Sequence, residues 1–351
     1  MRMVNQYYRT LQKAAVSPDP ALTLFGSLSG SDKWYGGVLA PNGKIYGIPY
    51  NASQVLEIDP ATNTTVLFGS LGAASFKWAG GVLAPNGKIY GVPFASNSVL
   101  EIDPVANTTV LFGSLGALGN RKWVGGVLAP NGKIYCIDRN ATQILEIDPV
   151  ANTTALFGSI SGNLKRYGGS LAPNGKIYGV PFNATEIIEI TPTANTSVLF
   201  GSLAGSIKWF GSVLAPNGKI YGVPFVSNSV LEIDPSTNTT AVFGSLGSGN
   251  KWVGGVLAPN GKIYCIPNGS SAVLEIDPST NTTAVFGSLG SGGKWVGGVL
   301  APNGKIYCIP YDETRVLEIS NVGTATAAMT TIPSPISGLA SSVYNRHQNK
   351  F

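Results

Sequence analysis

Short apolar runs, each followed by polar turn residues, recur along the chain. In the first copy of the pattern the runs occupy about Trp34–Ala40, Lys44–Pro49, Gln54–Ile58 and Thr64–Leu71. They are rich in β-branched and aromatic residues and too short for helices, so each is predicted to be a β-strand. Runs such as Val66–Phe68 carry no polar residue, which is typical of sheets buried on both faces.

Two turn motifs join the predicted strands. Ala-Pro-Asn-Gly-Lys, first at 40–44, occurs seven times. Its Pro presets φ and its Gly suits a left-handed position, so the motif predicts a three-residue hairpin with a G1 bulge. Asp-Pro-x-x-Asn, first at 59–63, is expected to form a later turn in which the Asp caps backbone N–H groups. Each unit is therefore read as four strands.

The unit recurs with a nearly constant period. Its core, Lys-Trp-x-Gly-Gly-Val-Leu-Ala-Pro-Asn-Gly-Lys-Ile-Tyr, begins seven times at spacings of 44, 45, 43, 43, 43 and 43 residues. A four-stranded unit of about 40–50 residues is typical of one blade of a β-propeller. We therefore expect an all-β propeller of antiparallel blades over residues 21–335. An N-terminal extension at 1–20 and a C-terminal tail at 336–351 flank this single domain.

The number of blades depends on how the chain ends are used. Leu22–Leu28 has the pattern of a fourth strand, although it precedes the first unit. It is expected to pair with the last unit and close the ring. However, Thr324–Ile332 also fits the fourth strand of that unit, and Ile336–Val343 resembles a first strand. Seven blades are favoured, eight with a composite blade from both termini are the alternative, and either closure is expected to remove exposed strand edges.

A Gly pair stands in the first strand of most units, first as Gly36-Gly37. The first strands of a propeller line a crowded centre, where small residues let backbones approach closely. A β-bulge explains the same glycines equally well. The sequence is compatible with both interpretations.

Composition and charge narrow the function classes. Charged residues make up only 12% of the chain, about half the usual share, and the net charge is +5. This excess comes mostly from one Lys position per unit, so no clustered nucleic-acid-binding patch is expected. The three Cys replace Gly in single units and form no disulfide framework. No membrane-spanning or signal segment is visible, the compartment is not predicted, and a monomer is expected.

The repeat resembles the NHL, YVTN and streptogramin-lyase-like propellers. The residues that carry the likeness are Gly37–Tyr46 and Val55–Pro60, and it extends over about Ala21 to Asn321. The resemblance implies the fold but not one function, because such propellers include both binding proteins and enzymes. The lyases of this group use a metal and a His, whereas the only His here is His347 in the tail. Their activity is therefore not carried over.

Candidate catalytic or metal-binding groups are few. Glu57 and Asp59 lie two apart on one strand, so they share a face and suit acid–base chemistry or Ca²⁺ binding. The favoured interpretation is that Asp59 caps its turn and Glu57 pairs with Lys or Tyr of a neighbouring strand. Equivalent pairs are Glu101/Asp103, Glu146/Asp148, Glu232/Asp234 and Glu275/Asp277. No catalytic residue, metal ligand or cofactor is predicted.

Ten Asn residues lie in Asn-x-Ser/Thr sequences, which are potential glycosylation sites in a secreted protein. The recurring Asn-Thr-Thr is better explained by turn chemistry. These Asn residues are Asn51, Asn63, Asn107, Asn140, Asn152, Asn183, Asn195, Asn238, Asn268 and Asn281.

The loops between fourth and first strands (d–a) and between second and third strands (b–c) are expected on one face of a propeller. Lys beside aromatic residues is suited to binding sugars, anions or peptides. The alternatives are that the Trp rings fill the space between blades and that the Lys side chains are solvated. The d–a candidates are Lys33, Trp34, Lys77, Trp78, Lys122, Trp123, Lys165, Arg166, Lys208, Trp209, Lys251, Trp252, Lys294 and Trp295. The b–c candidates are Tyr50, Phe94, Arg139, Phe182, Phe225 and Tyr311.

These features favour a non-catalytic binding scaffold that recognises a protein, peptide or carbohydrate on the Lys/Trp face. Asp138-Arg139 in the third unit and Arg166 in the fourth break the repeat, which indicates either an asymmetric site between these units or sequence drift. Units six and seven are nearly identical, which allows multivalent binding. The alternatives are a lectin-like carbohydrate binder, a lyase- or hydrolase-like enzyme in the central channel, and a recently amplified or constructed repeat with no evolved ligand.

Overall fold

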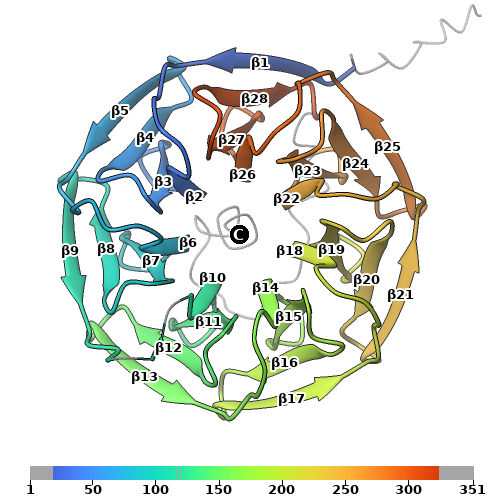
Figure 1. Cartoon of the computed structure of the whole chain (residues 1–351), viewed down its shortest axis with the longest axis horizontal. Coiled ribbons are helices and arrows are strands. Elements are labelled where there is room, and N and C mark those ends of the chain that lie inside the picture. Colours follow the sequence, from blue (N-terminus) through green and yellow to red (C-terminus); the bar gives the residue numbers. More distant parts are fainter. Residues whose placement is uncertain (1–18, 117, 120, 324–351) are drawn as a thin grey trace, which may run out of the picture.

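Seven four-stranded antiparallel sheets form a closed ring in the computed structural model (Figure 1), which describes residues 19–116, 118–119 and 121–323. The protein is a seven-bladed β-propeller, so the favoured blade number is confirmed. Within the described ranges, no helix is long and apolar enough to cross a membrane.

Each blade runs from an inner to an outer strand. The innermost (a) strands are β2 (Trp34–Leu39), β6 (Trp78–Leu83), β10 (Trp123–Leu128), β14 (Arg166–Leu171), β18 (Trp209–Leu214), β22 (Trp252–Leu257) and β26 (Trp295–Leu300). The b strands are β3 (Ile45–Pro49), β7 (Ile89–Pro93), β11 (Ile134–Asp138), β15 (Ile177–Pro181), β19 (Ile220–Pro224), β23 (Ile263–Pro267) and β27 (Ile306–Pro310). The c strands are β4 (Val55–Asp59), β8 (Val99–Asp103), β12 (Ile144–Asp148), β16 (Ile187–Thr191), β20 (Val230–Asp234), β24 (Val273–Asp277) and β28 (Val316–Ser320). The outer (d) strands are β5 (Thr64–Phe68), β9 (Thr108–Phe112), β13 (Thr153–Phe157), β17 (Thr196–Phe200), β21 (Thr239–Phe243), β25 (Thr282–Phe286) and, in the last blade, β1 (Ala21–Phe25).

The N-terminal strand closes the ring. β1 pairs with β28 in antiparallel register from Ala21 opposite Ser320 to Phe25 opposite Val316. This is the pairing expected for the strand pattern at Leu22–Leu28. The two competing segments, Thr324–Ile332 and Ile336–Val343, lie outside the described residues.

Closure does not remove the outer edges, and that expectation was wrong. β1 fills the vacant outer place of the last blade, but each outer strand remains the final strand of its own sheet. The ring is closed because each blade has its four strands, but the blades are separate sheets, so the outer edge of each one stays unpaired. The outer strands therefore lie along the rim of the disc (Figure 1).

The turns follow their predicted chemistry. The Gly43 N–H donates to the Ala40 carbonyl at 3.0 Å, and the Ala40 N–H donates to the Lys44 carbonyl at 2.9 Å. Gly43 has φ +80°, which confirms the left-handed position of the hairpin. In the following turn, Asp59 Oδ1 accepts the Ala61 N–H at 2.9 Å, so the capping role is also confirmed.

The two glycines of each pair have different roles: the first forms a β-bulge, and the second allows close approach of the neighbouring blade. Gly36 has φ +78° and lies where the pairing of β2 with β3 shifts register, so it forms a bulge. A Cβ on Gly37 would lie 2.5 Å from Ile309 of the adjacent blade, so this position requires close approach. The fifth blade has Ser212 there instead, and its hydroxyl bonds Ser170 of the fourth blade at 3.0 Å. Ser170 replaces the larger Val of other blades, which makes room for Ser212.

Candidate functional site

The repeated Lys residues are buried at the loop face. All seven are at most 6% exposed. The Lys208 ammonium donates to the Ala184 carbonyl at 2.8 Å and to the Gly205 carbonyl at 2.7 Å. Ala184 belongs to the b–c loop of the preceding blade and Gly205 to the d–a loop that leads into β18. Each such Lys therefore fastens two neighbouring loops together, and burial lowers the pKa of Lys208 to about 8.

The repeated Trp residues are also buried. All six are at most 3% exposed. Trp78 packs among Val38 and Ile48 of the preceding blade and Leu100 of its own. Its indole N–H donates to the Ser98 carbonyl at 2.8 Å. These positions match the blade-packing interpretation of the Trp residues.

Arg166 takes the place of Trp in the fourth blade. Its Nη2 donates to the Glu186 carbonyl at 3.2 Å, twenty residues further along, as each Trp N–H does in its own blade. Its Nη1 donates to Asp138 of the third blade at 3.0 Å, and Lys165 lies 3.6 Å from the same carboxylate. Burial raises the pKa of Asp138, and the two cations oppose that rise. The expected asymmetry between these blades is thus a buried ion cluster rather than an open cleft.

On the opposite face, the Glu carboxylates of the c strands link neighbouring blades. Glu57 accepts hydrogen bonds from Lys44 at 2.5 Å and from Tyr46 at 3.3 Å within its blade. Asn107 of the next blade donates to the same carboxylate at 3.2 Å. The favoured pairing of Glu with Lys and Tyr is therefore confirmed.

The same network accounts for six of the ten Asn-x-Ser/Thr sequences. Each Asn has φ between +51° and +55° and directs its Nδ2 toward a Glu of the adjacent blade, so the folded protein uses the atom that a glycan would occupy. These residues are Asn63, Asn107, Asn152, Asn195, Asn238 and Asn281.

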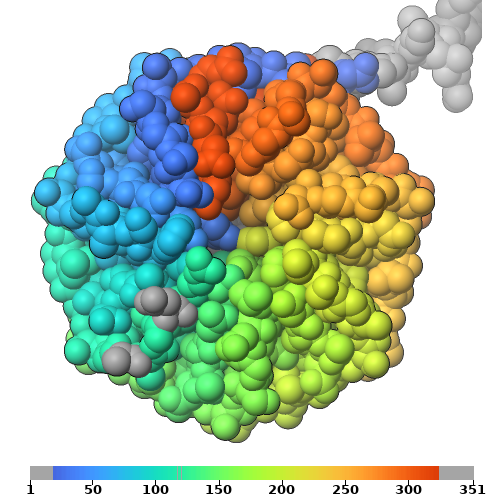
Figure 2. All heavy atoms as spheres, viewed as in Figure 1, coloured from blue at the N-terminus to red at the C-terminus, as the bar shows by residue number. Residues whose placement is uncertain are grey.

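Aromatic side chains close the axis at the loop face. Tyr35 of the first blade and Phe210 of the fifth approach across the centre with ring centroids 6.3 Å apart. Phe210 also contacts Tyr167 at 4.1 Å. The b–c candidates Tyr50, Phe94, Phe182, Phe225 and Tyr311 join this cluster. Viewed down the axis, the blades meet around a narrow centre (Figure 2).

Arg139 lies within the aromatic cluster. It is 6% exposed, and its guanidinium carbon lies 5.1 Å from the Phe94 ring centroid and 5.0 Å from that of Tyr167. Its Nε donates to the Tyr167 hydroxyl. Its Nη1 has no hydrogen-bond partner among the described residues. A buried guanidinium N–H without an acceptor is a ready site for an anionic group.

Sequence reasoning missed the residues at the tips of the d–a loops. The residue before the repeated Lys has φ between +50° and +60° in five blades, and it differs in each one. Asn side chains of the preceding b–c loops hold some of these strained backbones, as when Asn183 Oδ1 accepts the Ile207 N–H at 2.8 Å. The sequence signal that could have revealed them is that the residue before the repeated Lys differs from blade to blade, although the Lys itself never changes. The five residues are Asp32, Phe76, Arg121, Leu164 and Ile207.

These tips give the face two oppositely charged sides. Arg121 is exposed and lies 5.4 Å from the Phe76 ring centroid. Asp32 and Asp312 lie on the far side, where Asp312 Oδ1 accepts the Asp32 N–H at 2.8 Å. Between them the rings of Phe76 and Tyr50 are 5.1 Å apart, and those of Tyr50 and Tyr311 are 6.0 Å apart. We call Phe76, Tyr50 and Tyr311 the aromatic strip.

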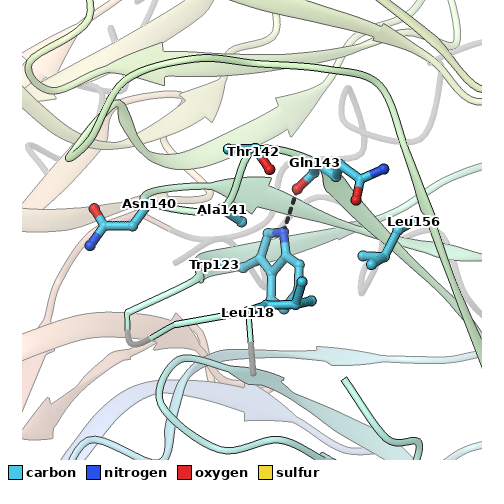
Figure 3. Close-up of a pocket in the computed structure, with 7 residues that line it drawn as sticks. All are labelled: Leu118, Trp123, Asn140, Ala141, Thr142, Gln143 and Leu156. Carbon is cyan, nitrogen blue, oxygen red and sulfur yellow. Dashed lines mark hydrogen bonds between the residues drawn. The ribbon is translucent and has the colours of Figure 1, made fainter. Parts of the chain in front are cut away.

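A small pocket lies in the third blade (Figure 3). It has a volume of about 70 Å³, and Leu118, Trp123 and Leu156 line it together with the b–c loop residues from Asn140 to Gln143. The d–a loop that contributes Leu118 is the longest of the repeats. The pocket has room for little more than water, so it is too small for a peptide or sugar ligand.

Comparison with known proteins identifies the fold. No protein-family model and no curated protein matches the chain. Among solved structures, virginiamycin B lyase from Staphylococcus aureus matches with a TM-score of 0.75 at 12% identity, over 86% of this chain and 99% of that one. A streptogramin B lyase structure matches with 0.73 at 13%, over 86% and 97%. Kuenenia stuttgartiensis hydrazine synthase matches with 0.65 at 15%, over 83% and 96%.

The protein is therefore a seven-bladed β-propeller with the fold of the streptogramin and virginiamycin B lyases. The fold resemblance read from the repeat core is confirmed. Identities this low show the fold alone.

Proposed function

We propose that the protein is a non-catalytic recognition module that binds a short extended ligand carrying opposite charges at its two ends, such as a peptide. The observation that carries the proposal is the aromatic strip, with arginines at one end and aspartates at the other. The Lys and Trp residues support the loops beneath this surface instead of contacting the ligand.

The positive end of the surface has two arginines with different roles. Arg121 is exposed and reaches an incoming carboxylate first. Arg139 is buried in the aromatic cluster, and its Nη1 has no hydrogen-bond partner among the described residues. Arginine is suited to this task because its planar fork matches a carboxylate.

The strip limits the length of the ligand. Successive centres from Arg121 to Phe76, Tyr50 and Tyr311 are 5.4, 5.1 and 6.0 Å apart. An extended chain advances roughly 3.4 Å per residue, so about five residues span this surface. Phe76 and Tyr311 are partly exposed and offer apolar area to such a chain.

Three observations support a non-catalytic role. One of the matched structures is a catalytically inactive histidine-to-alanine variant of virginiamycin B lyase with quinupristin, whereas the single His of this chain is His347. The described residues contain no group of three His, Cys, Asp or Glu side chains suited to a metal. The packed rings of Tyr35, Tyr167 and Phe210 fill the centre of the loop face, where an active site in the central channel would lie.

Calorimetric titration with pentapeptides tests the proposal. A pentapeptide with free termini and a central Trp is compared with its N-acetylated, C-amidated form. The free peptide is expected to bind at least tenfold more tightly, which corresponds to about 1.4 kcal/mol. Arg121→Gln and Asp32→Asn should each remove most of that difference.

Asp19→Asn is the matched control, because Asp19 is exposed and lies on the N-terminal segment before β1. Equal binding of free and blocked peptides, or binding of neutral oligosaccharides in their place, contradicts the proposal. Release of cleavage products from the peptide contradicts its non-catalytic part.

A further inference from the structure

The rim of the disc is an unusual surface. Seven outer strands lie along it (Figure 1), and no described strand pairs with their outer sides. Their sequences contain only Ala, Ser, Thr, Val, Leu and Phe, with no charged residue and no Pro. The strands are β1, β5, β9, β13, β17, β21 and β25.

The third residue of each outer strand is exposed in all seven blades. Where it is Val, between 52% and 54% of the residue is accessible, and Leu67 and Leu111 beside it are 41% and 50% exposed. Proteins usually protect such edges with Lys, Pro, bulges or a covering loop. The described rim has none of the first three devices within its strands.

We propose that the rim pairs edge to edge with a second copy of this chain, through antiparallel alignment of one outer strand from each disc. Two copies of Thr-Thr-Val-Leu-Phe related by a two-fold axis present the same uncharged residues to each other, so the edge is self-complementary. The strand of a different protein could not be recognised here through charge, because the outer strands carry no charged residue. The sequence alone led to the opposite expectation, a monomer.

Pairing through one short strand buries little surface, so the association is weak and depends on concentration. Each disc offers several equivalent edges. A pair of discs therefore keeps free edges, and larger assemblies follow as concentration rises.

Sedimentation velocity of the full chain from low to high micromolar concentration tests this inference. The average sedimentation coefficient is expected to rise with concentration. A variant with Lys at the third position of every outer strand should remain monomeric throughout. Its substitutions are Thr23→Lys, Val66→Lys, Val110→Lys, Ala155→Lys, Val198→Lys, Ala241→Lys and Ala284→Lys.

The matched control places a similar number of Lys residues in the exposed turns after the c strands, where Val105 and Val150 are each 92% exposed. This variant should associate as the parent chain does, measured in 0.5 M salt to suppress repulsion between added charges. Its substitutions are Ala61→Lys, Val105→Lys, Val150→Lys, Thr193→Lys, Ser236→Lys and Ser279→Lys.

A second measurement does not depend on how the variants fold. An excess of the free peptide Thr-Thr-Val-Leu-Phe should occupy the edges and return the assemblies of the parent chain to monomers. A chain that stays monomeric at all concentrations overturns the inference. So does association that survives both the rim substitutions and the peptide, or that is lost equally in the turn variant.

Discussion

At the residue scale, backbone strain gathers at the loop face. Five non-glycine residues before the repeated Lys adopt left-handed conformations, among them the β-branched Ile207 at φ +56°. Such a residue is a genuine outlier, and strain of this kind persists only where surrounding contacts impose it. Here the imposing contacts are the buried Lys208 and the Asn183 side chain. The strained tips are the same residues that vary between blades.

Relief of this strain should stabilise the protein. Ile207→Asn is expected to raise the free energy of unfolding by about 1 kcal/mol, because Asn tolerates the left-handed region better than Ile. Urea denaturation measures the change, with Val105→Asn as the control at an exposed site without positive φ. An unchanged or lower stability for Ile207→Asn means that the backbone there is not strained.

At the residue scale, sequence patterns predicted which loops form the loop face, but not which of their side chains are exposed. The spacing of Lys and Trp correctly predicted where the d–a loops begin. It did not distinguish exposed from buried side chains, because a motif repeated in every blade looks alike whether it binds a ligand or a neighbouring blade. The accessible candidates, Arg121 and Phe76, depend on contacts between loops of different blades.

At the element scale, each blade is fastened to the next at both ends. Lys208 joins loops on one face, and Glu189 joins turns on the other by accepting Nδ2–H of Asn238 at 2.8 Å. The junction of the sixth and seventh blades differs, because the turn after β28 lacks Asp-Pro-x-x-Asn. There Glu275 accepts from Lys262 and Tyr264, and its side chain is 15% exposed against 5% for Glu189.

This difference supplies a matched pair of substitutions. Glu189→Gln should lower the free energy of unfolding by about 1.5 kcal/mol more than Glu275→Gln, because it also weakens a bond to the next blade. Chemical denaturation of both variants at neutral pH makes the comparison. Equal losses would show that the inter-blade bond contributes nothing to stability.

The same Glu predicts a pH dependence. Burial acts to raise the pKa of Glu189, but hydrogen bonds from Lys176, Asn238 and Tyr178 outweigh it, so the pKa is lowered overall. A lowered pKa in the folded state contributes stability above the usual value near 4.5, and this is lost as pH falls through the folded value. The parent chain should therefore lose stability more steeply than Glu189→Gln in this acidic window. Parallel slopes in urea titrations at several pH values would contradict this assignment.

At the scale of the whole molecule, stability depends on joining distant parts of the chain. β1 and β28 are separated by almost the whole propeller, yet they supply neighbouring strands of one sheet. Contacts of this kind impose a large loop-closure entropy. A covalent bond across the same pair of strands should therefore stabilise the ring.

Ala21→Cys/Ser320→Cys tests the closure, because these residues are direct partners in the antiparallel register. The oxidised double variant should be more stable than its reduced form by about 3 kcal/mol. The native Cys136, Cys265 and Cys308 are buried and do not compete. Each single variant serves as a control, and thermal unfolding with and without reductant gives the measurement. A disulfide that fails to form would contradict the observed pairing.

The sequence by itself determined the four-stranded unit, its turns, the sevenfold repetition and the strand that closes the ring. Periodicity, Gly and Pro placement and capping are local, so they can be read along one blade. Only the tertiary structure decided which repeated side chains are buried, which Gly of each pair meets a neighbour, and where charges face each other across the loop face. Those properties arise between blades, where residues about 43 positions apart or across the axis come into contact.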